Sequence, residues 1–323
     1  MKAQAGLFLV LVALIIGVVY MLNNQGTLDF SSITEKISFG SNSLTYKVGY
    51  PENVYSNDGF DFNLTLKNGF DFKVNAYAWL ESGNVFSYNG KSVNKENTLK
   101  FRTLEPGENS TIVWNVKSSK VSDEIDAKIY LNVEYKPVYD YSENNYQFTI
   151  TAVNNNSLKY YSLDKLGINY EQKKAPIDVI VSSYDPSDFI YKEGTNSDAK
   201  LYIAVANAGN GEIEFKDKPY NVLVKIFGND ISRLKCENAV KVTSNGIQML
   251  QIPLNVTNSQ QVIPCNYTLT GITDLKVSNY KMIVEYTYLE SSDINIHVSS
   301  ETKPEETNRG ESTITKEPPA KPI

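Results

Sequence analysis

From Leu44 onward, hydrophobic and polar residues alternate along many short segments of the chain. The segment 60–67 is typical, with apolar residues Phe60, Phe62, Leu64 and Leu66 between Asp61, Asn63, Thr65 and Lys67. A period of two places apolar side chains on one face of a β-strand and polar ones on the other. Segments 112–116 and 129–135 repeat the pattern, and Asn-Gly, Asp-Gly and Pro-Gly turns separate such runs. The sequence therefore predicts an all-β fold of antiparallel strands.

The pattern runs through the chain twice. Leu201, Ile203 and Val205 lead into the turn 207–211, as the strand 60–67 leads into Asn68-Gly69. The strand 250–254 is expected to match the strand that carries Trp114, and the closing strands share Val-Glu-Tyr at 133–135 and 284–286. We predict two tandem immunoglobulin-like antiparallel β-sandwiches, over 44–153 and 176–298, with a connector over 154–175.

An apolar run precedes these strands. Residues 5–22 contain no charge, and their number suits a single transmembrane helix. Lys2 lies before the run and the next basic residue is Lys36, so the positive-inside rule predicts the N-terminus inside and the remaining chain outside. We predict a membrane anchor over 1–22, a polar stalk over 23–43, and a cell-membrane location with the lipid bilayer as a partner.

Two other interpretations of this run remain open. A cleaved secretory signal has a shorter apolar core and a small-x-small cleavage site, and neither is present here. The short basic head before the apolar run also resembles archaeal type IV pilin precursors. That resemblance implies a filament subunit that is cut before the apolar helix.

Composition limits the remaining chain. The formal net charge is −6 and the basic residues are scattered, which argues against nucleic acid or an anionic membrane surface as a partner. The segment 299–323 is rich in Pro, Glu, Thr and Lys and has no aromatic residue, so we predict that it is disordered.

The chain has two cysteines, Cys236 and Cys265. In an oxidising exterior compartment these are expected to form a disulfide, the alternative being two buried free thiols. One histidine and two well-separated cysteines lack the spacing of a structural zinc site, so no metal ligands are predicted.

Five N-x-S/T sequons are candidate glycosylation sites, because an acceptor asparagine must lie on the surface of an exported chain. They begin at Asn63, Asn109, Asn155, Asn255 and Asn266.

No motif for catalysis or for a cofactor stands out. Acyl transfer through a histidine base would depend on His297 alone, and the carboxylates have no distinctive spacing, so we expect no enzyme activity. Segments 57–61 and 140–144 bring oxygen ligands together, but solvated turns are a simpler explanation than calcium sites. Six tyrosines form either a contact surface or packing for the connector, and we favour packing: Tyr139, Tyr141, Tyr146, Tyr160, Tyr161 and Tyr170.

One stretch supports a family resemblance. Residues 104–116 (LEPGENSTIVWNV) resemble the "L-x-PGE, then a strand with Trp" segment of CARDB-like and related immunoglobulin-like modules in archaeal and bacterial surface proteins. In the second repeat, the turn 243–246 (TSNG) stands where Pro-Gly-Glu is expected. The resemblance implies a structural or adhesive cell-envelope protein, with envelope proteins or glycans as partners. A pilin-like filament subunit and a carbohydrate-binding surface module are the alternatives.

Overall fold

The computed structural model describes residues 44–138, 146–300 and 311–315, apart from the single positions 174, 196, 217, 258 and 259. The predicted anchor and stalk lie outside these residues. Among those described, no helix is long and apolar enough to cross a membrane. The described chain is almost entirely β-structure, as the alternating pattern predicts.

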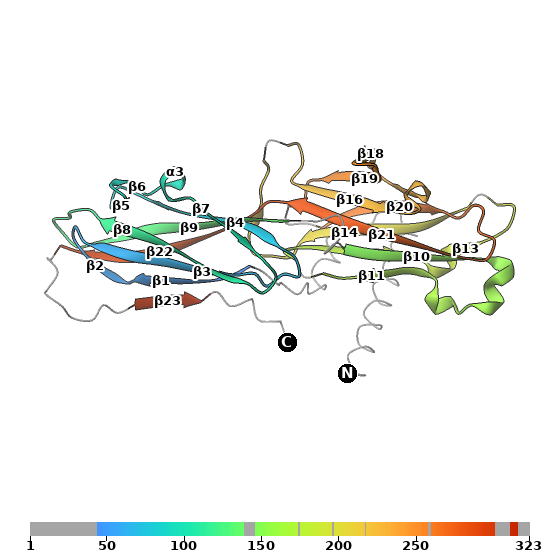
Figure 1. Ribbon diagram of the computed structural model, residues 1–323, viewed down its shortest axis with the longest axis horizontal. Coiled ribbons are helices and arrows are strands. Elements are labelled where there is room, and N and C mark those ends of the chain that lie inside the picture. The colour runs from blue at the N-terminus through green and yellow to red at the C-terminus, as the bar shows by residue number, and fades with distance from the viewer. Residues whose placement is uncertain are drawn as a thin grey trace, which may run out of the picture.

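Sandwich 1 consists of sheets A and B (Figure 1). Sheet A has the order β23 (Glu311–Thr315), β1 (Thr45–Pro51), β3 (Gly59–Lys67), β8 (Asn109–Ser118), β5 (Phe86–Tyr88) and β6 (Lys91–Ser92). Sheet B has the order β15 (Glu212–Ile213), β22 (Tyr288–Ser299), β9 (Ile125–Pro137), β4 (Val74–Ser82) and β7 (Lys100–Leu104), with β2 (Asn53–Tyr55) also beside β22. A short helix, α3 (Lys95–Thr98), precedes β7.

Sandwich 2 consists of sheets C and D. Sheet C has the order β11 (Gly167–Glu171), β10 (Tyr146–Asn154), β21 (Leu275–Tyr286), β16 (Val222–Gly228), β19 (Ile247–Leu254) and β18 (Val240–Ser244), with β13 (Ile190–Tyr191) parallel to β10. Sheet D has the order β12 (Ile177–Ser183), β14 (Asp198–Asn207), β20 (Gln261–Thr268) and β17 (Leu234–Cys236). Four 3₁₀ turns are η1 (Asn155–Tyr160), η2 (Leu163–Lys165), η3 (Pro186–Phe189) and η4 (Ile231–Arg233).

The period-two pattern defines the two faces of each sheet. In β3, the four apolar residues of the alternating run are buried and the residues between them are exposed or half-buried. Phe62 lies opposite Trp114 of β8, and both side chains are fully buried. The Trp114 indole N–H donates to the carbonyl of Thr98 at 2.6 Å, which satisfies the polar end of a large buried ring.

The two sandwiches share one strand order. Sheet A contains β1-β3-β8-β5 and sheet D contains β12-β14-β20-β17, while β9-β4-β7 of sheet B corresponds to β21-β16-β19 of sheet C. β3 therefore corresponds to β14, and β9 corresponds to β21, which are the two strands that carry Val-Glu-Tyr. The strand 250–254 lies in β19 and corresponds to β7, so its expected match with the Trp114 strand is wrong. The 243–246 turn joins β18 to β19, so it also does not correspond to the Pro-Gly-Glu turn between β7 and β8.

A shared asparagine motif supports the same correspondence. Asn68 accepts a hydrogen bond from the N–H of Phe70 and donates to the carbonyl of Phe72. Asn207 likewise accepts from the N–H of Gly209 and donates to the carbonyl of Gly211. Each side chain therefore bonds the backbone two and four residues later, so both asparagines fix the same turn after equivalent strands.

Two strands lie in the opposite sandwich from the one expected. All of β10 except Asn154 falls within the predicted first unit, 44–153, but the strand pairs with β21 in sheet C. All of β22 except Ser299 falls within the predicted second unit, 176–298, but the strand pairs with β9 in sheet B along eleven register positions. Sandwich 2 is therefore inserted between β9 and β22, and the boundaries of a linear tandem are corrected accordingly. Alternation identifies a strand but not its partner, which is why the sequence misplaced both.

Part of the segment 299–323, which the sequence predicts to be disordered, forms a strand in the structure. Residues 311–315 form β23, which pairs antiparallel with β1. Residues 301–310 and 316–323 lie outside the described chain. In the predicted connector, β11 pairs with β10 and so belongs to sheet C.

Candidate functional site

The junction of the two sandwiches is crossed by two neighbouring stretches of chain. β9 and β22 are paired on the sandwich 1 side, with Tyr135 opposite Tyr288. β10 and β21 are paired on the sandwich 2 side, with Tyr146 opposite Met282. A single residue, Thr287, separates β21 from β22. The chain therefore enters and leaves sandwich 2 at one place (Figure 1).

Tyrosines fill the interior of this junction. The rings of Tyr135 and Tyr288 have centroids 5.3 Å apart, and the Tyr146 hydroxyl donates to the carbonyl of Ile177 at 3.2 Å. Burial, followed by the neighbouring tyrosines, raises the pKa of the buried Tyr286 well above its usual value. Its hydroxyl has no hydrogen-bond partner among the described residues. Tyr146, one of the six tyrosines in the sequence analysis, is therefore a core residue.

The loop after β14 holds sandwich 2 against β22. The Tyr288 hydroxyl donates to Asn207 Oδ1 at 3.0 Å and accepts from the N–H of Gly211 at 2.8 Å. A Cβ at Gly211 would lie 2.3 Å from the Leu289 carbonyl oxygen, so only glycine allows this approach. The loop then continues into β15, which pairs with β22 and adds an edge strand to sheet B.

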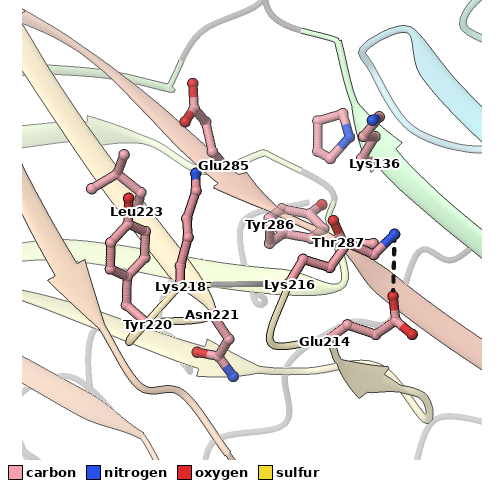
Figure 2. A pocket seen from close by; sticks show the side chains of 11 residues that line it. Lys136, Glu214, Lys216, Lys218, Tyr220, Asn221, Leu223, Glu285, Tyr286 and Thr287 are labelled. Atoms are coloured by element: carbon pink, nitrogen blue, oxygen red, sulfur yellow. Dashed lines mark ion pairs between the residues drawn. The ribbon is translucent and has the colours of Figure 1, made fainter.

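A pocket of about 280 Å³ opens on the surface of the junction (Figure 2). Its lining comes from the end of β9, the loop between β15 and β16, and the crossing at Thr287. The residues are Lys136, Pro137, Glu214, Lys216, Lys218, Tyr220, Asn221, Leu223, Glu285, Tyr286 and Thr287. Asn221 is buried and fixes the base of the loop, because its side chain donates to the carbonyl of Val256 and accepts from the Val256 N–H.

Ion pairs fix several charges in and beside the pocket. The Lys216 ammonium lies 2.5 Å from the buried carboxylate of Glu134 and 3.4 Å from Glu214 (Figure 2). Burial lowers the pKa of Lys216, but these two carboxylates outweigh it and leave the pKa above its usual value. Lys225 lies 2.5 Å from Glu285. Lys216 therefore connects a loop of sandwich 2 to the outer face of sheet B.

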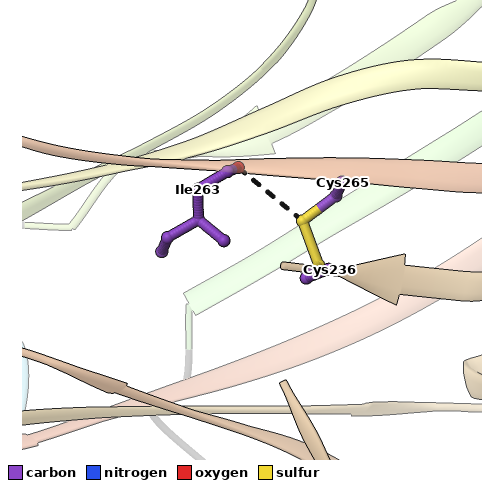
Figure 3. Close-up of a disulfide and its surroundings, with 3 residues drawn as sticks. All are labelled: Cys236, Ile263 and Cys265. Carbon is purple, nitrogen blue, oxygen red and sulfur yellow. Dashed lines mark hydrogen bonds between the residues drawn. A yellow bond between two sulfur atoms is a disulfide. The ribbon is translucent and has the colours of Figure 1, made fainter. Parts of the chain in front are cut away.

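The predicted disulfide is present in sandwich 2 (Figure 3). Cys236 of β17 and Cys265 of β20 are directly opposed in antiparallel strands, with Cα atoms 4.0 Å apart. The dashed line in Figure 3 joins Cys265 Sγ to the Ile263 carbonyl at 3.8 Å. Because an oxidised sulfur carries no hydrogen, we treat this as a van der Waals contact. The bond ties the short edge strand β17 to the sheet.

The five sequon asparagines all reach the surface. Asn109, Asn155, Asn255 and Asn266 are exposed, and Asn63 is half-buried on the outer face of β3. Their positions fit the surface requirement, and their modification remains a prediction.

The other candidate residues do not converge on one site. His297 lies on the exposed face of β22, with Nδ1 2.9 Å from Asp126 and Nε2 3.7 Å from Glu124. In the 57–61 segment, Asp58 Oδ1 accepts from the N–H of Gly59, and Asp61 accepts from Asn115 of β8. Within the described chain, no group of three His, Cys, Asp or Glu residues is arranged to hold a metal ion. The 140–144 segment lies outside the described residues.

Three further members of the six-tyrosine set, Tyr160, Tyr161 and Tyr170, lie at the end of η1 and in β11. Tyr160 is 73% exposed in η1, and Tyr161 donates to Asp274 at 3.1 Å. Tyr170 packs against the core from β11. Tyr139 and Tyr141 lie outside the described chain.

Comparison with known proteins gives little information. No protein-family model matches the chain, and no curated protein matches it. A search of solved structures finds Escherichia coli alpha-2-macroglobulin activated by porcine elastase, 9% identical over 81% of this chain and 22% of that chain, with a TM-score of 0.19. The chain thus spans about a fifth of that protein's length, and a TM-score this low supports no conclusion about fold or function.

Proposed function

We propose that the protein is a membrane-anchored structural or adhesive component of the cell envelope, without catalysis, and that it resembles CARDB-like immunoglobulin-like modules. The apolar run 5–22 and the charge asymmetry around it support the anchor and its orientation. The disulfide between Cys236 and Cys265 supports an oxidising compartment.

The observation that supports a structural role most strongly is the insertion of sandwich 2 between β9 and β22. Two chain crossings, the Tyr288 contacts and the Lys216–Glu134 pair connect the sandwiches at one junction. Flexible linkers between domains leave their relative position free, whereas this junction restricts it. Such an arrangement suits an element that holds a surface feature at a set distance from the membrane.

The Pro-Gly-Glu segment supports the resemblance in physical terms. The Glu108 N–H donates to the Glu105 carbonyl and Gly107 has φ +78°, as a turn with proline first and glycine second requires. The Gly107 N–H donates to the carbonyl of Asn68. The motif therefore joins β7 to β8 and docks on the asparagine turn after β3.

Protease treatment of intact cells tests the exterior location. Residues beyond 22 should be digested, while a cytoplasmic marker protein in the same cells stays intact. If both sandwiches are fully protected, although the protease digests another surface protein, the exterior assignment is wrong. Alkylation of the freshly isolated protein is a second test, because Cys236 and Cys265 should react only after reduction.

A further inference from the structure

Two lysines in the junction pocket, Lys136 and Lys218, carry charge that no carboxylate of the described residues neutralises. Within the described chain neither ammonium forms an ion pair, whereas Lys216 and Lys225 both do. Each free lysine lies near an aromatic ring instead: Lys136 Nζ is 5.5 Å from the Tyr77 ring centre, and Lys218 Nζ is 5.3 Å from that of Tyr220. Both side chains are exposed, so a ligand can reach them from solvent.

The carboxylates of the pocket are already engaged. Glu214 pairs with Lys216, and Glu285 pairs with Lys225 at 2.5 Å. Moving either carboxylate to Lys136 or Lys218 would break an existing pair. Among the described lining residues, the charge available to a ligand is therefore positive and comes from two ammonium groups.

These two ammonium groups belong to different parts of the pocket. Figure 2 shows Lys136 beside Pro137 on one side and Lys218 beside Tyr220 on the other, with Tyr286 between them. The volume of about 280 Å³ is near the lower limit, about 300 Å³, of pockets that hold small organic ligands. One carboxylate placed at either lysine leaves the other lysine unpaired.

We propose that this pocket binds a small dicarboxylate, with one carboxylate at Lys136 and the other at Lys218. Each lysine offers a point charge with three donors, which suits a carboxylate without requiring a fixed geometry. The apolar surfaces of Leu223 and of the tyrosine rings contact the carbon chain between the two acids.

Isothermal titration calorimetry with the full-length chain in mild detergent tests this proposal. The probes are succinate, glutarate, adipate and pimelate, with hexanoate as the monocarboxylate control and adipamide as the uncharged control. We expect one dicarboxylate to bind at least threefold more tightly than hexanoate, adipamide to show no binding, and added salt to weaken the complex.

Substitutions assign the site. Lys136→Gln and Lys218→Gln should each weaken that dicarboxylate about two- to fivefold, the range that exposed ion pairs supply, and should remove its advantage over hexanoate. Lys91→Gln on β6, far from the junction, should leave affinity unchanged. The proposal is overturned if no dicarboxylate exceeds hexanoate, or if the affinity survives in the variant that carries both substitutions with an unchanged circular dichroism spectrum.

Discussion

The hydroxyl of Tyr288 donates a hydrogen bond to Asn207 Oδ1 across the junction of the two sandwiches, over 3.0 Å. Tyr288 opens β22 in sheet B, and Asn207 closes β14 in sheet D. Because Asn207 also fixes its own turn through Gly209 and Gly211, one phenol contacts a loop that is already held in place. The contact therefore links the fold of one sandwich to the position of the other.

Tyr288→Phe should destabilise the protein by about 1 to 3 kcal/mol, because it leaves the Gly211 N–H without its partner in a part-buried site. Urea unfolding followed by circular dichroism measures the change. Tyr160→Phe is the matched control, since Tyr160 is 73% exposed, and its curve should overlay that of the unchanged protein. Equal curves for both variants would show that the Tyr288 hydroxyl contributes nothing.

Gly211→Ala should destabilise the protein by about 1 to 3 kcal/mol or more, because its Cβ would lie 2.3 Å from the Leu289 carbonyl oxygen and 2.7 Å from the Tyr288 ring. Gly83→Ala is the control, since a Cβ there meets nothing within 4 Å. Thermal melting should show a lower midpoint for the first variant only. An unchanged midpoint for Gly211→Ala would mean that the loop moves away from β22 at no cost.

Fragments test the inserted arrangement. Residues 146–286 contain every strand of sheets C and D and should fold alone with a cooperative melt. Residues 44–137 lack β22 and should not fold, whereas the same residues joined to 288–299 by a short turn should fold, because Tyr135 and Tyr288 are opposed. Circular dichroism and melting distinguish these fragments. Cooperative folding of 44–137 alone would show that β22 is dispensable.

The disulfide should stabilise sandwich 2. The cysteines are separated by 29 positions, and closing a loop of that size contributes about 3 to 4 kcal/mol in the chain-entropy treatment. Reduction should therefore lower the melting midpoint of the 146–286 fragment. A variant with both Cys236→Ala and Cys265→Ala should melt like the reduced protein and should not respond to the reductant. A response in that variant would mean that the reductant acts elsewhere.

Asp230 should make stability depend on pH. Burial raises the pKa of this carboxyl, but hydrogen bonds from Lys276 and Ser278, with the charges of Lys276 and Arg233, leave the pKa below its usual value. The stabilisation is therefore present above about pH 4 and is lost as pH falls through the folded-state pKa.

Melting at pH 7 and at pH 3 tests this expectation. Asp230→Asn should lower the midpoint at pH 7, and the difference from the unchanged protein should shrink at pH 3. Asp71→Asn, in the exposed turn before β4, should show no difference at either pH. A difference for Asp230→Asn that is the same at both pH values would exclude charge as its cause.

The sequence predicts local features of this fold well. Alternation over 60–67 identifies β3, because the side-chain period of a strand is visible in a few residues. The cysteine pair follows from the presence of two cysteines and from the predicted exterior compartment. The match of Asn68 with Asn207 also follows from the sequence, since each closes an alternating strand before a glycine-containing turn.

Features that depend on contacts between residues far apart in the sequence do not follow from the hydrophobic pattern. Strand β10 pairs with β21, more than a hundred residues later, and no residue in either strand marks that choice. The pocket also depends on such contacts. Lys136 and Lys218 are far apart in the sequence, and they line one pocket only because sandwich 2 is inserted beside the end of β9. That neither ammonium has a carboxylate partner among the described residues is visible only when its neighbours in space are known.

The crossing at Thr287 determines how the molecule transmits force between its sandwiches. β21 continues through this single residue into β22, and each strand is embedded in its own sheet, β21 between β10 and β16 and β22 beside β9. A pull along the long axis, applied at the outer ends of the two sandwiches, therefore runs along these two strands (Figure 1). The load shears their rows of hydrogen bonds together instead of opening them one at a time.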